Sequence, residues 1–213
     1  LGLGSTRRRS DTERGLIQPP VHALAALLVA DATATANPAA ARAFERELYP
    51  ALRQWHDYLV RDRARGRVLA EIVHPWESGT DNSPLWDAAL ERIPATPATV
   101  ITRPDLQHAG VGERPGDREY AKFFWLAEEY RDGACRDHDD CVRLVDPLFN
   151  TLWAVSERAL AVIAERCGED PRPHRERADA IDEARAAAQG GEQLGLRSGH
   201  ERLQTQRLDL VEQ

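Results

Sequence analysis

The segment His74–Asp87, HPWESGTDNSPLWD in one-letter code, is the most informative stretch of this 213-residue chain. It places two tryptophans, a glycine and several carboxylates in a short stretch without helical periodicity, directly before a stretch that favours a helix. Ser83 is a favourable N-cap and Pro84 suits the first helical position, so a helix is predicted from there to about Arg92. The polar residues before it are expected to lie on a loop at the mouth of a helical scaffold.

This loop carries residue types that suit a carbohydrate site. The indole face of Trp76 can pack on a sugar ring, and a carboxylate on the same loop can interact with the oxygens of the sugar. Each candidate also has an ordinary structural interpretation, since Trp76 could be a core aromatic and Asp81 a second capping group for the helix at Pro84.

The rest of the chain predicts helices joined by loops, with no convincing run of alternating strand residues. Helices are expected at residues 20–31, at 38–59 with a kink at Pro50, at 117–132, at 146–168 and at 173–188. The connection from Ile93 to Pro115 is long, polar and proline-bearing, which is typical of functional or disordered loops. The basic cluster Arg61–Arg67 and His174 are expected to be solvated.

Three motifs, in chain order, resemble glycoside hydrolase family 63. They are Gln18-Pro19-Pro20, the core Trp-Glu-Ser-Gly-Thr-Asp-Asn-Ser at residues 76–83, and Glu113-Arg114-Pro115 followed by Tyr120. That family of inverting enzymes holds processing α-glucosidases and bacterial mannosylglycerate and glucosylglycerate hydrolases. The similarity runs from about residue 15 to about residue 170, and it is strongest to the small bacterial members that act on glycosylglycerates.

The resemblance implies an all-α fold, namely a partial (α/α)6 toroid with about half of the barrel helices. It also implies hydrolysis of a small α-glycoside, such as mannosylglycerate or glucosylglycerate, with inversion and with Asp81 as the general acid. A useful acid near neutral pH needs a raised pKa, which an apolar wall such as Trp76 would provide. The nearby helix N-terminus would lower the same pKa, so the direction of the shift stays open.

The resemblance also assigns binding roles. Gln18 matches a residue that hydrogen-bonds sugar hydroxyls, Trp76 and Gly79 match the lining of the sugar subsite, and Arg114 and Tyr120 match the aglycone side. A guanidinium pairs bidentately with a carboxylate, so Arg114 would suit glycerate, although a surface arginine in a polar loop is the alternative. Glu77 is expected to orient the loop.

The second catalytic carboxylate is predicted to be missing from this chain. Acids from Glu157 onward follow helix-surface patterns or lie in the Gln-rich tail, and no Phe, Tyr or Trp follows Trp153. The chain has no Met, and the family's aromatic-rich N-terminal portion is not recognisable. These features favour a truncated or frame-disrupted product, with a disordered or truncated edge at 1–14, a partial hydrolase domain at 15–188 and a divergent, disordered tail at 189–213.

The alternative function is a catalytically inactive helical remnant or a weak sugar-binding module. A half toroid would leave apolar helix faces uncovered, and such faces favour self-association.

Composition excludes several other classes. A net charge of −7 without a clustered basic face argues against nucleic-acid binding, and no apolar stretch approaches the roughly 20 residues of a membrane span. Three cysteines, an odd number, favour a reducing, cytoplasmic location. Cys135, His138 and Cys141 are spaced like a metal clip but lack a fourth ligand. No metal or cofactor is therefore predicted, since two carboxylates and water suffice for the implied reaction.

Overall fold

The structure, a computed structural model, describes residues 15–94, 114–132 and 142–190. The described residues form helices and helical turns joined by loops, and the only pairing of extended backbone among them is an isolated antiparallel bridge between Ile72 and Leu144. The all-α prediction is confirmed. The elements are α1 (His22–Ala36), α2 (Pro38–Tyr58), η1 (Leu59–Ala64), α3 (Pro75–Ser78), η2 (Pro84–Trp86), α4 (Asp87–Leu90), α5 (Asp117–Asp132), α6 (Pro147–Cys167) and α7 (Arg172–Gly190).

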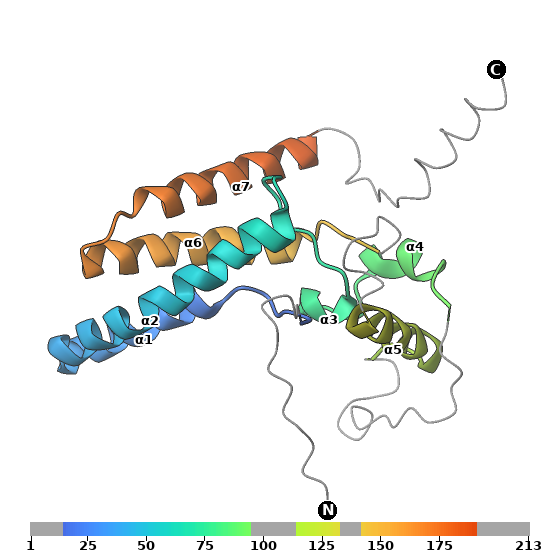
Figure 1. Cartoon of the computed structure of the whole chain (residues 1–213), viewed down its shortest axis with the longest axis horizontal. Coiled ribbons are helices and arrows are strands. Elements are labelled where there is room, and N and C mark those ends of the chain that lie inside the picture. The colour runs from blue at the N-terminus through green and yellow to red at the C-terminus, as the bar shows by residue number, and fades with distance from the viewer. Residues whose placement is uncertain (1–14, 95–113, 133–141, 191–213) are drawn as a thin grey trace, which may run out of the picture.

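Four long helices, α1, α2, α6 and α7, form a bundle (Figure 1). α1 packs on α2, α6 packs on α7, and both α1 and α2 pack on α6. Small residues on α1, Ala23 and Ala26, let it approach α2 and α6 closely, and larger side chains such as Leu160 and Ile163 fill the space between the helices. Burying each aliphatic side chain of this size stabilises the fold by about 1.5–3 kcal/mol.

The shorter helical elements lie at one end of the bundle of long helices, where a second apolar cluster forms. Trp86, Phe123, Phe149 and Trp153 are all almost completely buried in that cluster. It joins the segment that follows the sequence motif to α5 and to the start of α6.

Two helix starts are stabilised by capping side chains. The side chain of Asn37 accepts a hydrogen bond from the backbone N–H of Ala40 at 3.0 Å. The side chain of Asp146 accepts one from Phe149 at 2.6 Å. Each satisfies an amide that the first helical turn leaves without a partner, and each precedes a proline at the first helical position.

The end of α2 differs from the expectation. A π-helical turn, η1, extends the helix by six residues and ends at Arg65, whose backbone is left-handed with φ of 52°. The sequence predicts that the cluster Arg61–Arg67 is solvated, and this is wrong for Arg63, which is only 2% exposed. The wider turn has no periodic sequence signal and directs this one arginine inward.

Hydrogen bonds connect the loop before the motif to the first turn of α6 and to the segment that precedes it. Ile72 and Leu144 exchange two backbone hydrogen bonds of 2.9 Å. The amide side chain of Asn150 accepts a hydrogen bond from the backbone N–H of Ala70 at 2.8 Å and donates one to its carbonyl at 3.0 Å. These contacts join segments that are more than 70 residues apart in the sequence.

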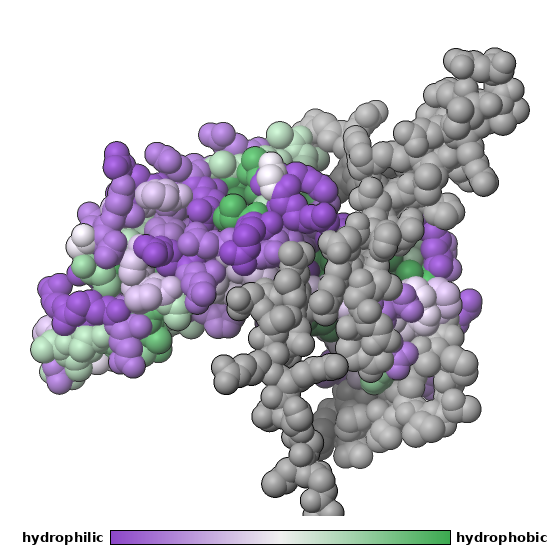
Figure 2. All heavy atoms as spheres, in the orientation of Figure 1, coloured by the Kyte–Doolittle hydropathy of each residue, from purple (hydrophilic) through white to green (hydrophobic). Residues whose placement is uncertain are grey.

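The surface seen in Figure 2 is mainly hydrophilic, with scattered apolar residues. Among the described residues, no helix combines the length and apolar character of a membrane span, and no group of three or more His, Cys, Asp or Glu side chains is placed to hold a metal ion. The clip formed by Cys135, His138 and Cys141 lies outside the described residues.

A buried ionic cluster joins α2, α6 and α7. Glu157 is completely buried and accepts hydrogen bonds from Trp153 Nε1 at 3.0 Å, His174 Nδ1 at 2.8 Å and Arg177 Nη1 at 2.9 Å. His56 Nδ1 lies 2.8 Å from the same carboxylate. The expectation that Glu157 and His174 face solvent is therefore wrong. The buried face of α7 is not recognisable from its charge-rich sequence, because His174 and Arg177 on that face are themselves polar and contact Glu157.

Burial alone would raise the pKa of Glu157, but the hydrogen bonds from His174 and His56 and the charge of Arg177 outweigh it and lower that pKa. The Glu157→Gln variant should lose about 3 kcal/mol or more of unfolding free energy in urea denaturation at pH 7, because Arg177 and the two buried histidines lose the carboxylate that they contact. Glu165→Gln, on the same helix, is the control: its pair with Arg175 is solvent-exposed and should contribute less than about 1 kcal/mol.

The same variant should also change the pH dependence of stability. A lowered carboxyl pKa stabilises the folded chain above the ordinary value of 4.5, and this contribution is lost as the pH falls further. The unmodified chain should thus lose stability below about pH 4.5 more steeply than Glu157→Gln. Equal slopes and equal stabilities would contradict an ionised, buried Glu157.

Candidate active site

The motif begins with a single helical turn, α3, rather than with the expected loop. His74 caps it: the ring Nδ1 accepts a hydrogen bond from the backbone N–H of Trp76 at 3.0 Å, and Nε2 lies 2.8 Å from the carbonyl oxygen of Phe123. Since Nδ1 accepts, the proton lies on Nε2, which donates to that carbonyl. Pro75 occupies the first helical position. The sequence does not predict this turn because four residues are too few to show periodicity.

The turn ends at Gly79, whose φ of 74° lies in the left-handed region. A Cβ at this position would lie 3.2 Å from Cγ of Pro19. Glycine is therefore favoured at position 79 for two reasons: it adopts this backbone conformation without strain, and it leaves room for the Gln18–Pro20 segment to pack on the motif.

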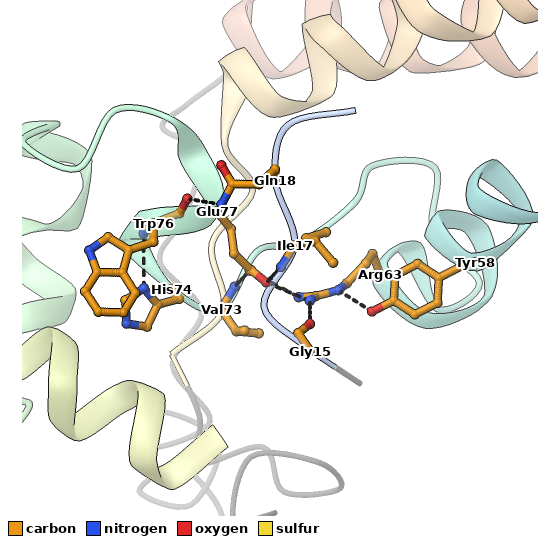
Figure 3. Close-up of polar contacts among 9 residues, drawn as sticks. All are labelled: Gly15, Ile17, Gln18, Tyr58, Arg63, Val73, His74, Trp76 and Glu77. Atoms are coloured by element: carbon orange, nitrogen blue, oxygen red, sulfur yellow. Dashed lines mark hydrogen bonds and ion pairs between the residues drawn. The ribbon is translucent and has the colours of Figure 1, made fainter. Parts of the chain in front are cut away.

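Glu77 forms the buried centre of the motif (Figure 3). One carboxylate oxygen accepts the backbone N–H of Val73 at 2.7 Å and the other that of Ile17 at 2.9 Å. The guanidinium of Arg63 pairs with both oxygens, at 2.7 and 3.2 Å. The expectation that Glu77 orients the loop agrees with this geometry. Burial lowers the pKa of Arg63, but the facing Glu77 carboxylate more than offsets this and raises it overall.

Gln18 and Trp76, which the sequence places in one site, are adjacent. The Gln18 side chain donates a hydrogen bond of 3.3 Å to the carbonyl oxygen of Trp76. The indole is partly buried. Its ring centroid lies 4.4 Å from that of His74, 6.1 Å from Tyr120 and 5.8 Å from Phe124. These aromatic contacts support the motif turn, and Tyr120 brings the first turn of α5 to it.

A pocket of about 800 Å³ opens beside this group. It brings together Gly79, the partly buried Asp81 and the exposed Arg114, whereas Gln18, Trp76 and Tyr120 are not among its lining residues. Its size falls in the range of small-ligand sites, roughly 300–1,000 Å³. The full lining consists of Gly79, Thr80, Asp81, Asn82, Ser83, Leu85, Arg114, Pro115, Asp146, Pro147 and Leu148.

Residues at the start of α6 also line the pocket. The sequence predicts this segment only as a helix boundary. Asp146 is 2% exposed, and burial raises its pKa although the backbone N–H groups of Phe149 and Leu148 act against this. Pro147 and Leu148 follow it in the lining. The Asp-Pro pair signals a helix start, and nothing in the sequence indicates that this start faces the motif.

The chain also matches a known protein family over most of its length. Residues 4–189 match the family model described as the mannosylglycerate hydrolase MGH1-like glycoside hydrolase domain. The chain belongs to this family. The resemblance to glycoside hydrolase family 63 is thereby confirmed.

Several relatives of this MGH1-like chain have known activities. Mannosylglycerate hydrolase of Rubrobacter radiotolerans is 41% identical over 178 residues, which cover 80% of this chain and 40% of that protein. Glucosylglycerate hydrolase of Mycolicibacterium hassiacum is 34% identical over 186 residues, covering 81% and 40%. The MGH1-like chain thus spans about two-fifths of the length of these relatives.

Solved structures agree. The mannosylglycerate hydrolase of family 63 from Thermus thermophilus, in complex with Tris, superposes with a TM-score of 0.70 at 30% identity and covers 81% of this chain and 42% of that one. The same protein was also solved with Tris and D-glycerate, and with glucose. The fold is therefore part of the (α/α)6 toroid of this family, as predicted.

The His74 ring provides a pH test of the motif turn. Burial lowers the pKa of His74 to about 4, and the hydrogen bond to the Phe123 carbonyl offsets this only in part. Protonation would place a hydrogen on Nδ1 and remove the acceptor for Trp76. Between about pH 6.5 and pH 4 the unfolded chain binds this proton and the folded chain does not, so stability should fall across that window as the pH decreases.

The measurement is an NMR titration of the imidazole Cε1 protons, with the His74→Gln variant to assign the resonance. Glutamine can keep an acceptor for Trp76 without titrating, so the variant should show a flatter loss of stability from pH 6.5 to 4. A His74 resonance that titrates near pH 6.5 would contradict the buried, neutral ring.

Proposed function

We propose that this chain carries the acid-bearing part of a glycoside hydrolase site that acts on a small α-glycoside such as mannosylglycerate or glucosylglycerate. The observation that carries the proposal is the pocket that brings Asp81 and Arg114 together beside the aromatic motif turn. Asp81 would protonate the glycosidic oxygen as the bond from that oxygen to the anomeric carbon breaks. Arg114 would pair with the glycerate carboxylate.

Inversion requires water to attack the opposite face of the sugar, activated by a carboxylate roughly 6.5–9.5 Å from the acid. Asp146 is the other carboxylate in the described pocket lining, and it suits this role poorly. One of its oxygens caps α6, and its burial disfavours the ionised form that a base needs. We therefore assign the base to the part of the family fold that this chain does not match.

The sugar end of the substrate is assigned to Gln18, Trp76 and Gly79, with Tyr120 toward the aglycone. Support comes from the direct contact of Gln18 with Trp76 and from the edge-to-face contact of Tyr120 with the same indole. The Thermus relative was solved with glucose and with D-glycerate, which correspond to the two parts of glucosylglycerate. No cofactor is part of the proposal. A reducing, cytoplasmic location stays a prediction, and Cys167 is a free thiol.

A second candidate is a catalytically inactive remnant or a weak sugar-binding module. It is favoured by the capping role of Asp146 and by apolar residues on the outer side of α1, where Leu28 is 60% and Val29 51% exposed. In that case the chain would bind the glycoside without cleaving it.

The first test measures release of glycerate from mannosylglycerate and glucosylglycerate, with and without sodium azide, because glycerate is the leaving group whether water or azide attacks. A small anion can attack the anomeric carbon directly and so replace water that lacks its base. Azide should therefore yield a glycosyl azide, and Asp81→Asn should slow this by about 10²–10⁴-fold. Asp87→Asn, an exposed acid outside the pocket lining, is the matched control and should react like the unmodified chain.

The outcomes separate the two candidates. Hydrolysis without azide would mean that a base is present in this chain. Equal rates in Asp81→Asn and the unmodified chain would refute the acid role. No product under either condition, from protein shown to be folded by circular dichroism, would support the inactive remnant.

The exposed face of α1 also predicts self-association. Size-exclusion chromatography with light scattering should show a mass that rises with protein concentration, because exposed apolar side chains such as Leu28 and Val29 favour association. Leu28→Glu combined with Val29→Lys should shift the protein toward the monomer. Val68→Glu, at an exposed apolar residue away from α1, should leave the mass unchanged; a monomer at all concentrations would contradict the prediction.

A further inference from the structure

The segment that carries Gln18 and the turn that carries Trp76 must be held together for the proposed sugar site to exist. Their direct link is the 3.3 Å hydrogen bond from Gln18 to the Trp76 carbonyl, which is exposed to solvent. A neutral hydrogen bond in water contributes at most about 1 kcal/mol. The placement of these two segments therefore depends on other contacts.

Those contacts converge on Glu77. Its two carboxylate oxygens receive backbone N–H groups from both sides, Ile17 next to Gln18 and Val73 ahead of the motif turn. Hydrogen bonds to a carboxylate are shorter and stronger than neutral ones. Glu77 is completely buried, and a buried carboxylate without a counter-charge would cost several kcal/mol. Glu77 can hold both segments only while a cation faces it.

Arg63 is that cation, and it reaches further than Glu77. Besides the bidentate pair, it donates to the carbonyl oxygen of Gly15 at 3.3 Å and to the hydroxyl of Tyr58 at 3.2 Å. Its guanidinium carbon lies 5.9 Å from the ring centre of Tyr130 on α5. One buried side chain thus contacts the segment before α1, the end of α2 and the motif (Figure 3), and it also contacts α5 through Tyr130.

The local backbone explains why this arginine turns inward. It lies in the π-helical turn η1, and π-helical turns are frequent at functional sites. Its neighbour Arg61 lies in the same turn, but its side chain is 70% exposed and pairs with Asp62. The two arginines therefore have the same chemistry and opposite environments.

We propose that Arg63 is a positioning residue of the sugar site. Through Glu77, it fixes the segment that carries Gln18 against the turn and loop that carry Trp76 and Asp81. Its assignment to a sugar site rests on the proposed function; its effect on the placement of the two segments does not. The apolar cluster between α1, α2 and α6 is separate from the one around the motif. Replacing Arg63 should therefore disturb the region around the motif and leave the packing of these long helices unchanged.

Hydrogen–deuterium exchange of the full chain tests the placement directly. In Arg63→Gln, exchange of the amides of Ile17 and Val73 should rise by about tenfold or more, while α6 keeps its protection. Arg63→Lys keeps the charge but loses the bidentate pair, so it should give a smaller rise in the same two segments. Arg61→Gln is the matched control and should leave both unchanged.

Two results overturn the proposal. One is unchanged exchange at both segments in Arg63→Gln and Arg63→Lys. The other is a uniform rise throughout α1, α2, α6 and α7, which would mean that Arg63 supports general stability only. If Arg63→Gln fails to fold, Arg63→Lys decides between these results.

Binding of mannosylglycerate, measured by titration calorimetry, separates this proposal from the proposed function. Arg63→Lys should weaken binding severalfold, and Gln18→Ala should weaken it less in that background than in the unmodified chain, because both changes remove the same contact. Strictly additive effects would overturn the positioning of Gln18. Absence of binding by the unmodified chain would refute the sugar site, and exchange would then decide the placement alone.

Discussion

A completely buried carboxylate needs charged or polar partners in place of its lost water, and Glu77 is such a group. Its partners are Arg63 and two backbone amides from distant parts of the chain. The requirement to satisfy this one charge brings the segment before α1, the end of α2 and the motif turn to one point. Most features of the candidate site, including the packing of Gly79 on Pro19, depend on that convergence.

Glu157, a second completely buried carboxylate, likewise has charged and polar partners, in this case within the bundle of long helices. Glu157 has partners on α2 and α7 as well as on its own helix, α6. The described chain has no sheet that would unite its helical hairpins, and the two acids contribute part of that connection. Each combines an arginine with further donors, so neither leaves an uncompensated charge inside the protein.

The long helices could be predicted from the sequence because their information is local. Asn37 and Asp146 are caps followed by proline, and α2 and α6 have clear apolar faces. The three sequence motifs were sufficient to identify the family. By contrast, η1 and α3 are too short to show a period, and the burial of Arg63 and Glu157 depends on partners that are up to about 100 residues away. Charge-rich sequence predicts solvated surface, and in these cases it forms the interior.

The candidate site was predictable in part for the same reason. Gly79 and Asp81 belong to one continuous motif, so their common pocket follows from the sequence, and the resemblance supplied Arg114. The contribution of α6 to the pocket, through Asp146, depends on tertiary packing that no local pattern encodes.

The pairing of Ile72 with Leu144, and of Ala70 with Asn150, has a consequence for the order of events in folding. Contacts between residues so far apart require closure of a long loop, which is slow compared with helix formation. The chain up to the motif can form α1 and α2, but Ala70 and Ile72 gain these hydrogen-bond partners only after the start of α6 has been synthesised and has docked. The pocket is thus among the last parts of the molecule to acquire its shape.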